Sequence, residues 1–197
     1  MKCLVVTAHP LAESLCRQLT EHVVNTLTAM DHEALVEDLY AEGFEPALTA
    51  AERASYYSDF YDFSNVSQQV ERLKQAEALV LLFPTWWFSF PAMLKGWFDR
   101  VWGPGIAYDH ADDFGPIKPR LDNLRKVLVI TTLGAPWWVD RFIMLQPVKR
   151  VLKVALLGAC TRKSTLKYLS LYSSEKLDEA RIAKFKKKID RALVGWK

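Results

Sequence analysis

Three uninterrupted apolar runs constrain the fold of this chain more than any other feature: residues 2–7 (KCLVVT), 78–83 (ALVLLF) and 126–132 (KVLVITT). A strand that is apolar on both faces must be buried on both faces, as in a parallel sheet covered by helices. Between these runs lie segments whose apolar side chains are spaced by three or four residues, which is typical of amphipathic helices. The alternation predicts a doubly wound α/β fold.

Weaker patterns complete the predicted fold. Ser14 is the expected N-cap of the first helix, and residues 103–125 are rich in glycine and proline and predict a loop. Residues 40–65 predict a second long loop, with a short helix near residues 50–57. Further strands are expected at 33–39 and 161–169, and helices at 14–29, 66–75, 91–102, 139–157 and 174–194. Five strands in one domain of residues 1–197 fit a flavodoxin-like sheet of order 2-1-3-4-5 with helices on both faces.

Composition excludes several classes of protein. The formal net charge is only +3, which does not indicate a nucleic-acid partner. The three cysteines, Cys3, Cys16 and Cys160, form no CxxC pair and fit a reducing, cytoplasmic location. The apolar stretch 79–98 is interrupted by prolines and a lysine, so we expect no membrane insertion. The four histidines show no metal-ligand spacing, so we expect no metal.

The first candidate site is the turn after the first strand, residues 7–15 (TAHPLAESL). Ligands of doubly wound sheets bind beyond the carboxyl ends of the strands, and a helix N-terminus there favours an anion. His9 and Ser14 can add hydrogen bonds to a phosphate. The turn has no GxGxxG and no GxxxxGK[ST], which disfavours a dinucleotide Rossmann loop and a P-loop. The alternative is an ordinary capped turn.

The second candidate site is the aromatic segment after the second apolar run, residues 78–83. Trp86, Trp87 and Phe88 follow Pro84, which cannot continue a strand ladder. Flat side chains at this edge are a suitable platform for a flat ligand ring, and the backbone N–H groups of residues 85–88 are expected to bond its polar edge. The alternatives are core packing and a subunit interface. Three further aromatic residues at helical spacing are expected to be structural: Trp97, Phe98 and Trp102.

These segments resemble the NAD(P)H:quinone oxidoreductase family of flavodoxin-like proteins. Residues 83–101 have the pattern F-P-x-x-W-F-x-x-P-A-x-L-K-G-W-F-D-R-V, which is similar to the family's signature. Residues 5–15 (V-x-x-A-H-P-x-x-x-S-L) are similar to its phosphate loop, and residues 105–108 and 130–134 to two later segments. Without the long C-terminal extension of the larger members, the sequence resembles the short bacterial ones, and we expect a protein of that type.

The resemblance implies a non-covalent flavin, FAD or FMN, with NAD(P)H as co-substrate and a quinone or similar flat molecule as hydride acceptor. It also implies a homodimer with the flavin site at the interface, where Tyr108 and His110 would approach the neighbouring subunit's ring. By position, the phosphate would be held by His9, Ser14 and Leu15, the ring by Pro84, Thr85, Trp86, Trp87 and Phe88, and its pyrimidine side by Thr132, Leu133 and Gly134.

The sequence departs from the family where the well-studied quinone reductases place a tyrosine and a histidine. Here the chain has Trp137, Trp138, Asp140 and Arg141. Arg141 is a candidate to stabilise an anionic reduced flavin; the alternative is a solvated arginine at a helix start.

Two other functions stay open at this point. Some relatives are ancillary flavin-binding subunits of potassium efflux systems, which implies a regulatory role as one alternative. A nucleic-acid or membrane-surface module is the other, based on the basic residues of the last helix. Those residues lie mostly opposite its apolar side, which fits a solvated helix face. They are Arg181, Lys184, Lys186, Lys187, Lys188 and Arg191.

Overall fold

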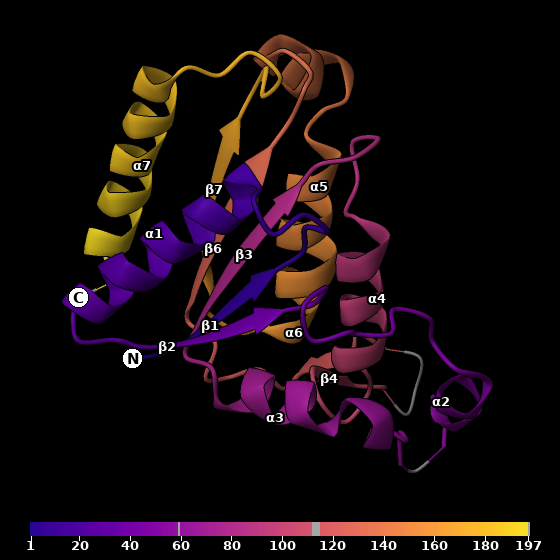
Figure 1. Ribbon diagram of the computed structural model, residues 1–197. Coiled ribbons are helices and arrows are strands. Elements are labelled where there is room, and N and C mark those ends of the chain that lie inside the picture. Colours follow the sequence, from indigo (N-terminus) through magenta and orange to yellow (C-terminus); the bar gives the residue numbers. More distant parts are fainter. Residues whose placement is uncertain (59, 112–114, 197) are drawn as a thin grey trace.

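Five parallel strands form the central sheet of the computed structural model, which describes residues 1–58, 60–111 and 115–196 (Figure 1). Residue 59 and residues 112–114, which fall in the two predicted loops, and residue 197, at the end of the expected domain, lie outside the described residues. The strand order β2-β1-β3-β6-β7 confirms the predicted order 2-1-3-4-5. The strands span Lys2–Thr7 (β1), Glu33–Asp38 (β2), Ala78–Pro84 (β3), Lys126–Thr132 (β6) and Thr165–Leu171 (β7).

Helices cover both faces of the sheet because successive side chains of a buried strand point to opposite sides. Leu4 and Val6 of β1 belong to one apolar core, and Cys3 and Val5 to the other. Figure 1 shows α1 and α7 over one face and α3 to α6 over the other. The helices span Leu15–Ala29 (α1), Ala50–Ser55 (α2), Ser67–Gln75 (α3), Ala92–Val101 (α4), Pro147–Arg150 (α5), Gly158–Cys160 (α6) and Glu179–Val194 (α7), with shorter or π-helical turns at Ser64–Val66 (η1), Val139–Ile143 (η2) and Val151–Leu157 (η3).

Helix α1 shows how the sequence forms these elements. Leu19, Val23 and Leu27 are buried and spaced by four residues, so one side of the helix faces the sheet. Ser14 is the N-cap, as predicted, and its Oγ accepts the N–H of Arg17 at 3.2 Å.

The prediction of one continuous helix over residues 139–157 is wrong. The chain leaves η2 through Leu145 and Gln146 and becomes helical again at Pro147. The two intervening residues have φ angles of 57° and 50°, in the left-handed region. Proline has no N–H to continue a preceding helix, and it disfavours a helical conformation in the residue before it. Residues 137–146 therefore form a separate projection at the top of the molecule in Figure 1.

Three other boundaries also differ from the predictions. The strand expected at 161–169 begins at residue 165, because the Thr161 hydroxyl donates to the Leu157 carbonyl and residue 161 ends the preceding helix. The last helix begins after Asp178 rather than at residue 174, and the Asp178 carboxylate accepts the N–H of Arg181 at 2.7 Å. The predicted loop 103–125 contains a short antiparallel pair, Tyr108–Asp109 (β4) and Lys118–Pro119 (β5).

None of the helices in the described part of the chain is both long and apolar enough to cross a membrane.

Candidate functional site

The carboxyl edge of the sheet brings three of the predicted loops together. Pro84 and Thr132 are partners in the sheet register, so β3 and β6 end at the same level. The N–H of Thr85 donates to the Thr132 carbonyl at 2.8 Å, which joins the loops that follow these strands. The rings of His9 and Trp86 have centroids 6.5 Å apart, which brings the loop after β1 to the same place. Residues from these three loops can therefore contact one ligand.

The loop between β1 and α1 offers hydrogen-bond donors to an anion. In the described part of the chain, no backbone acceptor takes the N–H groups of Leu15 and Cys16 in the first turn of α1. The Ser14 Oγ accepts the N–H of Arg17, so its own hydrogen remains to be donated. These donors lie at the positive end of the helix dipole. The structure thus brings the Ser14 hydroxyl and the Leu15 N–H together as neighbouring donors at the start of α1, and phosphate binding there stays a prediction.

The hydrogen bond of His9 determines what its ring can offer. The Nδ1 atom accepts the N–H of Leu11 at 3.1 Å, so the neutral ring carries its hydrogen on Nε2. That hydrogen is available to a phosphate. The arrangement suits the role that the resemblance implies for His9.

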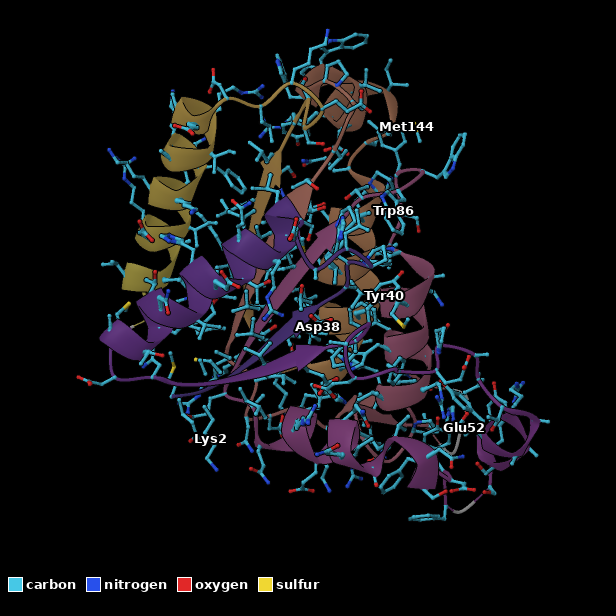
Figure 2. The ribbon with its side chains drawn as sticks, in the orientation of Figure 1. Lys2, Asp38, Tyr40, Glu52, Trp86 and Met144 are labelled. Carbon is cyan, nitrogen blue, oxygen red and sulfur yellow. The ribbon has the colours of Figure 1, made fainter. Side chains whose placement is uncertain are left out.

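A cavity of about 510 Å³ opens beside this loop. It is lined by His9, Ser14 and Arg17 on one side and by Asp38 and Tyr40 on the other. Figure 2 shows Asp38 and Tyr40 next to each other in the middle of the molecule, below Trp86. Neither residue was predicted from the sequence as part of the site. The available signal was their position: Asp38 is the last residue of β2 and Tyr40 lies two residues beyond it, at the same edge of the sheet.

The aromatic loop projects from the protein rather than packing into it. The side chain of Trp87 is 98% exposed and that of Trp86 is 42% exposed, which excludes core packing for both. Trp87 and Phe88 have φ angles of 49° and 55°, a conformation that is unfavourable for bulky side chains and is often found at functional sites. A pair of backbone hydrogen bonds between Trp86 and Ser89 closes this turn. The backbone of the loop is therefore closed into a turn that presents Trp86 and Trp87 to the solvent.

Two of the four backbone N–H groups that were predicted to bond a ligand ring are already hydrogen-bonded within the protein. The N–H of Thr85 is bonded to Thr132 and the N–H of Trp86 to Ser89, so neither is free for a ligand. Those of Trp87 and Phe88 have no acceptor among the residues that the structure describes. Two of the four expected donors thus remain available.

The third predicted segment lies next to the aromatic loop. The hydroxyls of Thr85 and Thr131 are 2.6 Å apart, and the N–H of Leu133 donates to the Leu171 carbonyl. The side chain of Leu133 is buried, whereas Gly134 is exposed and Thr132 is half-buried. Contacts of this segment with a ligand ring can therefore come from Thr132 and from the backbone near Gly134, and the Leu133 side chain belongs to the core.

The segment that replaces the family's tyrosine and histidine is partly exposed. Trp137 and Trp138 are each about half exposed, at 50% and 48%. Asp140 is buried and accepts the hydroxyl of Tyr172 at 2.8 Å, which anchors the segment to the end of β7. Arg141 is exposed and forms no ion pair in the described chain. Its role toward a reduced flavin stays a prediction.

Tyr108 and His110 lie elsewhere in the molecule. Tyr108 belongs to β4, which Figure 1 shows low on the right, far from the loops at the top. Its hydroxyl donates to that of Tyr56 at 3.0 Å, and the His110 ring stacks on Tyr57 with centroids 4.9 Å apart. Burial and the bond to Tyr56 raise the pKa of Tyr108, so its phenol remains protonated. The chain does not bring these two residues to its own Trp86.

The aromatic residues expected to be structural are buried. Trp97 is fully buried, and Phe98 and Trp102 are nearly so. The Trp97 Nε1 donates to the Glu37 carboxylate at 2.5 Å. Burial raises the pKa of Glu37, although hydrogen bonds from Arg72 and Trp97 work in the opposite direction. This network joins β2, α3 and α4 beneath the candidate site.

This is a doubly wound α/β protein with a turn of hydrogen-bond donors that are unpaired among the described residues and with an exposed aromatic loop on one edge of its sheet. Residues 1–193 match the family described as having a flavodoxin-like fold, and the chain belongs to this family.

Proteins similar to this chain are named as oxidoreductases. The chain is 38% identical over 109 residues to the uncharacterised NAD(P)H oxidoreductase YcaK of Escherichia coli K12, covering 53% of this chain and 54% of that one. It is 32% identical over 152 residues to NAD(P)H dehydrogenase (quinone) 1 of Cavia porcellus, covering 68% and 54%. The solved NAD(P)H:quinone oxidoreductase of Methanothermobacter marburgensis aligns with a TM-score of 0.82 at 27% identity, over 98% of this chain and 94% of that one. The chain spans about half the length of the curated relatives it matches.

Proposed function

We propose that the protein is a flavin-dependent NAD(P)H oxidoreductase that reduces a quinone or a similar flat acceptor by two electrons. The observation that carries this proposal is that a turn suited to bind an anion lies next to exposed tryptophans on one edge of the sheet. The ring centroids of His9, in that turn, and Trp86 are 6.5 Å apart. A flavin has the same two parts, a phosphate and a flat ring. The names of the similar proteins support the same reaction class.

The residues present fit a non-covalently bound FMN or FAD. The donors at the start of α1 and the His9 Nε2 would hold its phosphate. Trp86 and Trp87 would contact the ring, and the free N–H groups of Trp87 and Phe88 would bond its polar edge. The ring's other side would meet the segment at Thr132.

When bound, a flavin accepts a hydride from NAD(P)H and passes it on, so that NAD(P)H, a proton and a quinone give NAD(P)⁺ and a hydroquinone. The protein's own part is to orient flat molecules by stacking and to limit the access of water. It needs no cysteine nucleophile: burial raises the pKa of Cys3, Cys16 and Cys160 to about 11. Free, protonated thiols suit a reducing compartment, and we place this reaction in the cytosol.

A homodimer would complete the site. Tyr108 and His110 lie away from the chain's own aromatic loop, so they can serve only a ring held by another subunit. Exposed apolar side chains are gathered over the projection and the helical segment after it, and such a patch is typical of a protein interface. They are Trp137, Trp138, Phe142, Ile143, Met144, Leu145, Val151 and Val154.

Steady-state kinetics with a water-soluble naphthoquinone test the proposal. We call the space beside the flavin ring, next to Trp86 and Trp87, the slot. If NAD(P)H and the acceptor bind in this slot one after the other, double-reciprocal plots at several acceptor concentrations will be parallel. Intersecting lines would contradict a shared slot, and an absence of turnover with added FMN or FAD would contradict the proposed reaction.

A further inference from the structure

A cationic aromatic surface lies at the end of the molecule opposite Trp86. It consists of Arg53, Tyr56, Tyr57, Tyr108 and His110, and we call it the ledge. The Arg53 guanidinium lies over the Tyr57 ring at 5.1 Å and over the Tyr56 ring at 5.6 Å. Tyr57 stacks on His110, and the phenols of Tyr56 and Tyr108 are hydrogen-bonded. Arg53, Tyr57 and His110 are exposed, so the ledge presents a positive charge together with flat rings.

A buried ion pair holds the ledge in place. Glu52, next to Arg53 in α2, is 1% exposed, and its carboxylate accepts Nη2 of Arg100 in α4 at 2.6 Å. The Arg100 guanidinium also donates to the Glu45 carbonyl. A capping box between Thr49 and Glu52 begins α2. Because Glu52 faces inward, Arg53 faces outward and its orientation is fixed by the same short helix.

Two described acidic residues close to the ledge are paired with other arginines and not with Arg53. Glu52 is paired with Arg100, and Asp109 is paired with Arg120 at 2.9 Å. In the part of the chain that the structure describes, Arg53 itself has no carboxylate partner. An arginine that lies over aromatic rings and has no carboxylate partner among the described residues is well suited to bind phosphate.

The position of the ledge indicates which molecule it would meet. Figure 2 places Glu52 at the lower right, well apart from Trp86 at the upper right. Arg53 lies over the Tyr57 ring, and Tyr57 stacks on His110, so any surface that contacts His110 also lies close to Arg53. If Tyr108 and His110 face the flavin of a second copy, as the proposed function requires, the same contact brings Arg53 to the rim of that copy's slot.

We propose that Arg53 binds the phosphate groups of NAD(P)H at the neighbouring subunit's slot and so selects phosphorylated dihydronicotinamides as electron donors. This inference rests on the proposed function. The nicotinamide would lie among the aromatic residues, and the diphosphate or the 2′-phosphate would accept hydrogen bonds from the Arg53 guanidinium. An uncharged dihydronicotinamide would use the same rings but gain nothing from Arg53.

The test compares two electron donors in three proteins. The proteins are the wild type, Arg53→Gln and the control Arg162→Gln, whose arginine is exposed and paired with Asp122. The donors are NADPH and N-benzyl-dihydronicotinamide, which carries no phosphate. We expect Arg53→Gln to raise KM for NADPH about three- to tenfold, with kcat and the KM for the benzyl compound unchanged. Calorimetric binding of NADP⁺ should weaken by the same factor, and Arg162→Gln should resemble the wild type.

Three outcomes would overturn the inference. An equal rise of KM for both donors would mean that Arg53 only supports the shape of the ledge. An unchanged KM and unchanged NADP⁺ binding would mean that Arg53 does not contact the nucleotide. If the flavin-loaded wild type oxidised neither donor, the proposed function itself would fail, and the inference with it.

Discussion

Trp87 and Trp97 show how differently one residue type is used in this protein. Trp97 is fully buried beside Glu37, whereas the Trp87 side chain is 98% exposed in a turn of positive φ. An exposed tryptophan contributes little to folding, and its conformation there is unfavourable. Trp87 is therefore best explained by ligand contact, and Trp97 by packing.

Replacing each tryptophan by alanine separates these roles. Trp97→Ala should lower the free energy of unfolding by about 3–5 kcal/mol, since it leaves a large cavity. Trp87→Ala should change it by less than about 0.5 kcal/mol and should weaken flavin retention. Urea unfolding and the flavin content of the purified proteins measure the two effects. Equal flavin content and turnover in Trp87→Ala and the wild type would contradict the assignment of Trp87.

Glu77 makes stability depend on pH. The N–H of Lys2, at 2.9 Å, is the main cause that lowers the pKa of Glu77; burial opposes the shift, and Arg125 adds to it. A lowered pKa contributes stability above the ordinary carboxyl pKa that is lost as the pH falls through the folded-state value. Between pH 7 and about pH 3, the urea midpoint should thus fall more in the wild type than in Glu77→Gln. Parallel pH curves for the two proteins would exclude this contribution.

At the scale of elements, the part of the 83–101 motif that forms α4 serves mainly as a packing surface for the long segment at residues 40–65. A Cβ built on Gly96 would lie 2.1 Å from the Pro46 carbonyl oxygen, so the loop backbone lies directly on the helix. Arg100 binds Glu52 of α2, and the Tyr61 hydroxyl donates to the Arg100 carbonyl at 2.9 Å. The motif is thus as much a packing signature as a functional one.

Gly96→Ala tests this docking. The new methyl group must displace the backbone near Pro46, and overpacking of this kind typically costs about 1–3 kcal/mol. We expect a lower urea midpoint and faster proteolysis of residues 44–61. Gly195→Ala is the matched control, because its nearest contact is at 3.7 Å. Similar behaviour of the two variants would argue against close docking.

The Glu52–Arg100 pair gives a second test of the same elements. Arg100→Met leaves a buried carboxylate without its partner, which should cost about 3–5 kcal/mol. Adding Glu52→Leu removes the uncompensated charge, so the double variant should recover part of that stability. A double variant less stable than Arg100→Met in urea unfolding would show that the isolated charge is not the cause.

The sequence predicted elements well where one physical signal was sufficient. The apolar runs at 2–7 and 126–132 are strands with the expected bounds, because burial on both faces leaves a continuous apolar pattern. The prediction of a helix at 139–157 was wrong because the apolar residues at 142–145 are exposed, so the spacing of apolar residues does not reveal the break in the helix. The ledge was not predicted, since it depends on contacts between residues 53–57 and 108–110, which are far apart in the chain.

At the scale of the whole molecule, the aromatic loop and the ledge lie at different ends of one chain. A site that uses both needs two chains, and the exposed apolar side chains at 137–154 provide a surface through which they can meet. We therefore expect activity to depend on the number of subunits, because one site would use residues of two chains.

Charged substitutions on the exposed apolar surface at residues 137–154 test whether activity requires a dimer. Val151→Glu with Val154→Glu should convert a dimer into monomers, because both side chains are exposed in the single chain, at 43% and 69%, and would be buried in a dimer. The monomer should keep its fold and flavin but lose most turnover with NAD(P)H. Sedimentation velocity and kinetics measure this, with Lys187→Glu on the exposed side of α7 as the control. A wild type that is monomeric and fully active would contradict the shared site.

The most direct test of the central claim is the visible spectrum of the purified protein during anaerobic addition of NADPH or NADH, followed by a quinone. The account predicts a bound flavin whose absorbance bleaches with one equivalent of reduced nucleotide and returns with one equivalent of quinone. A protein that is colourless and does not take up added FMN or FAD would contradict the claim, and so would a bound flavin that neither nucleotide reduces.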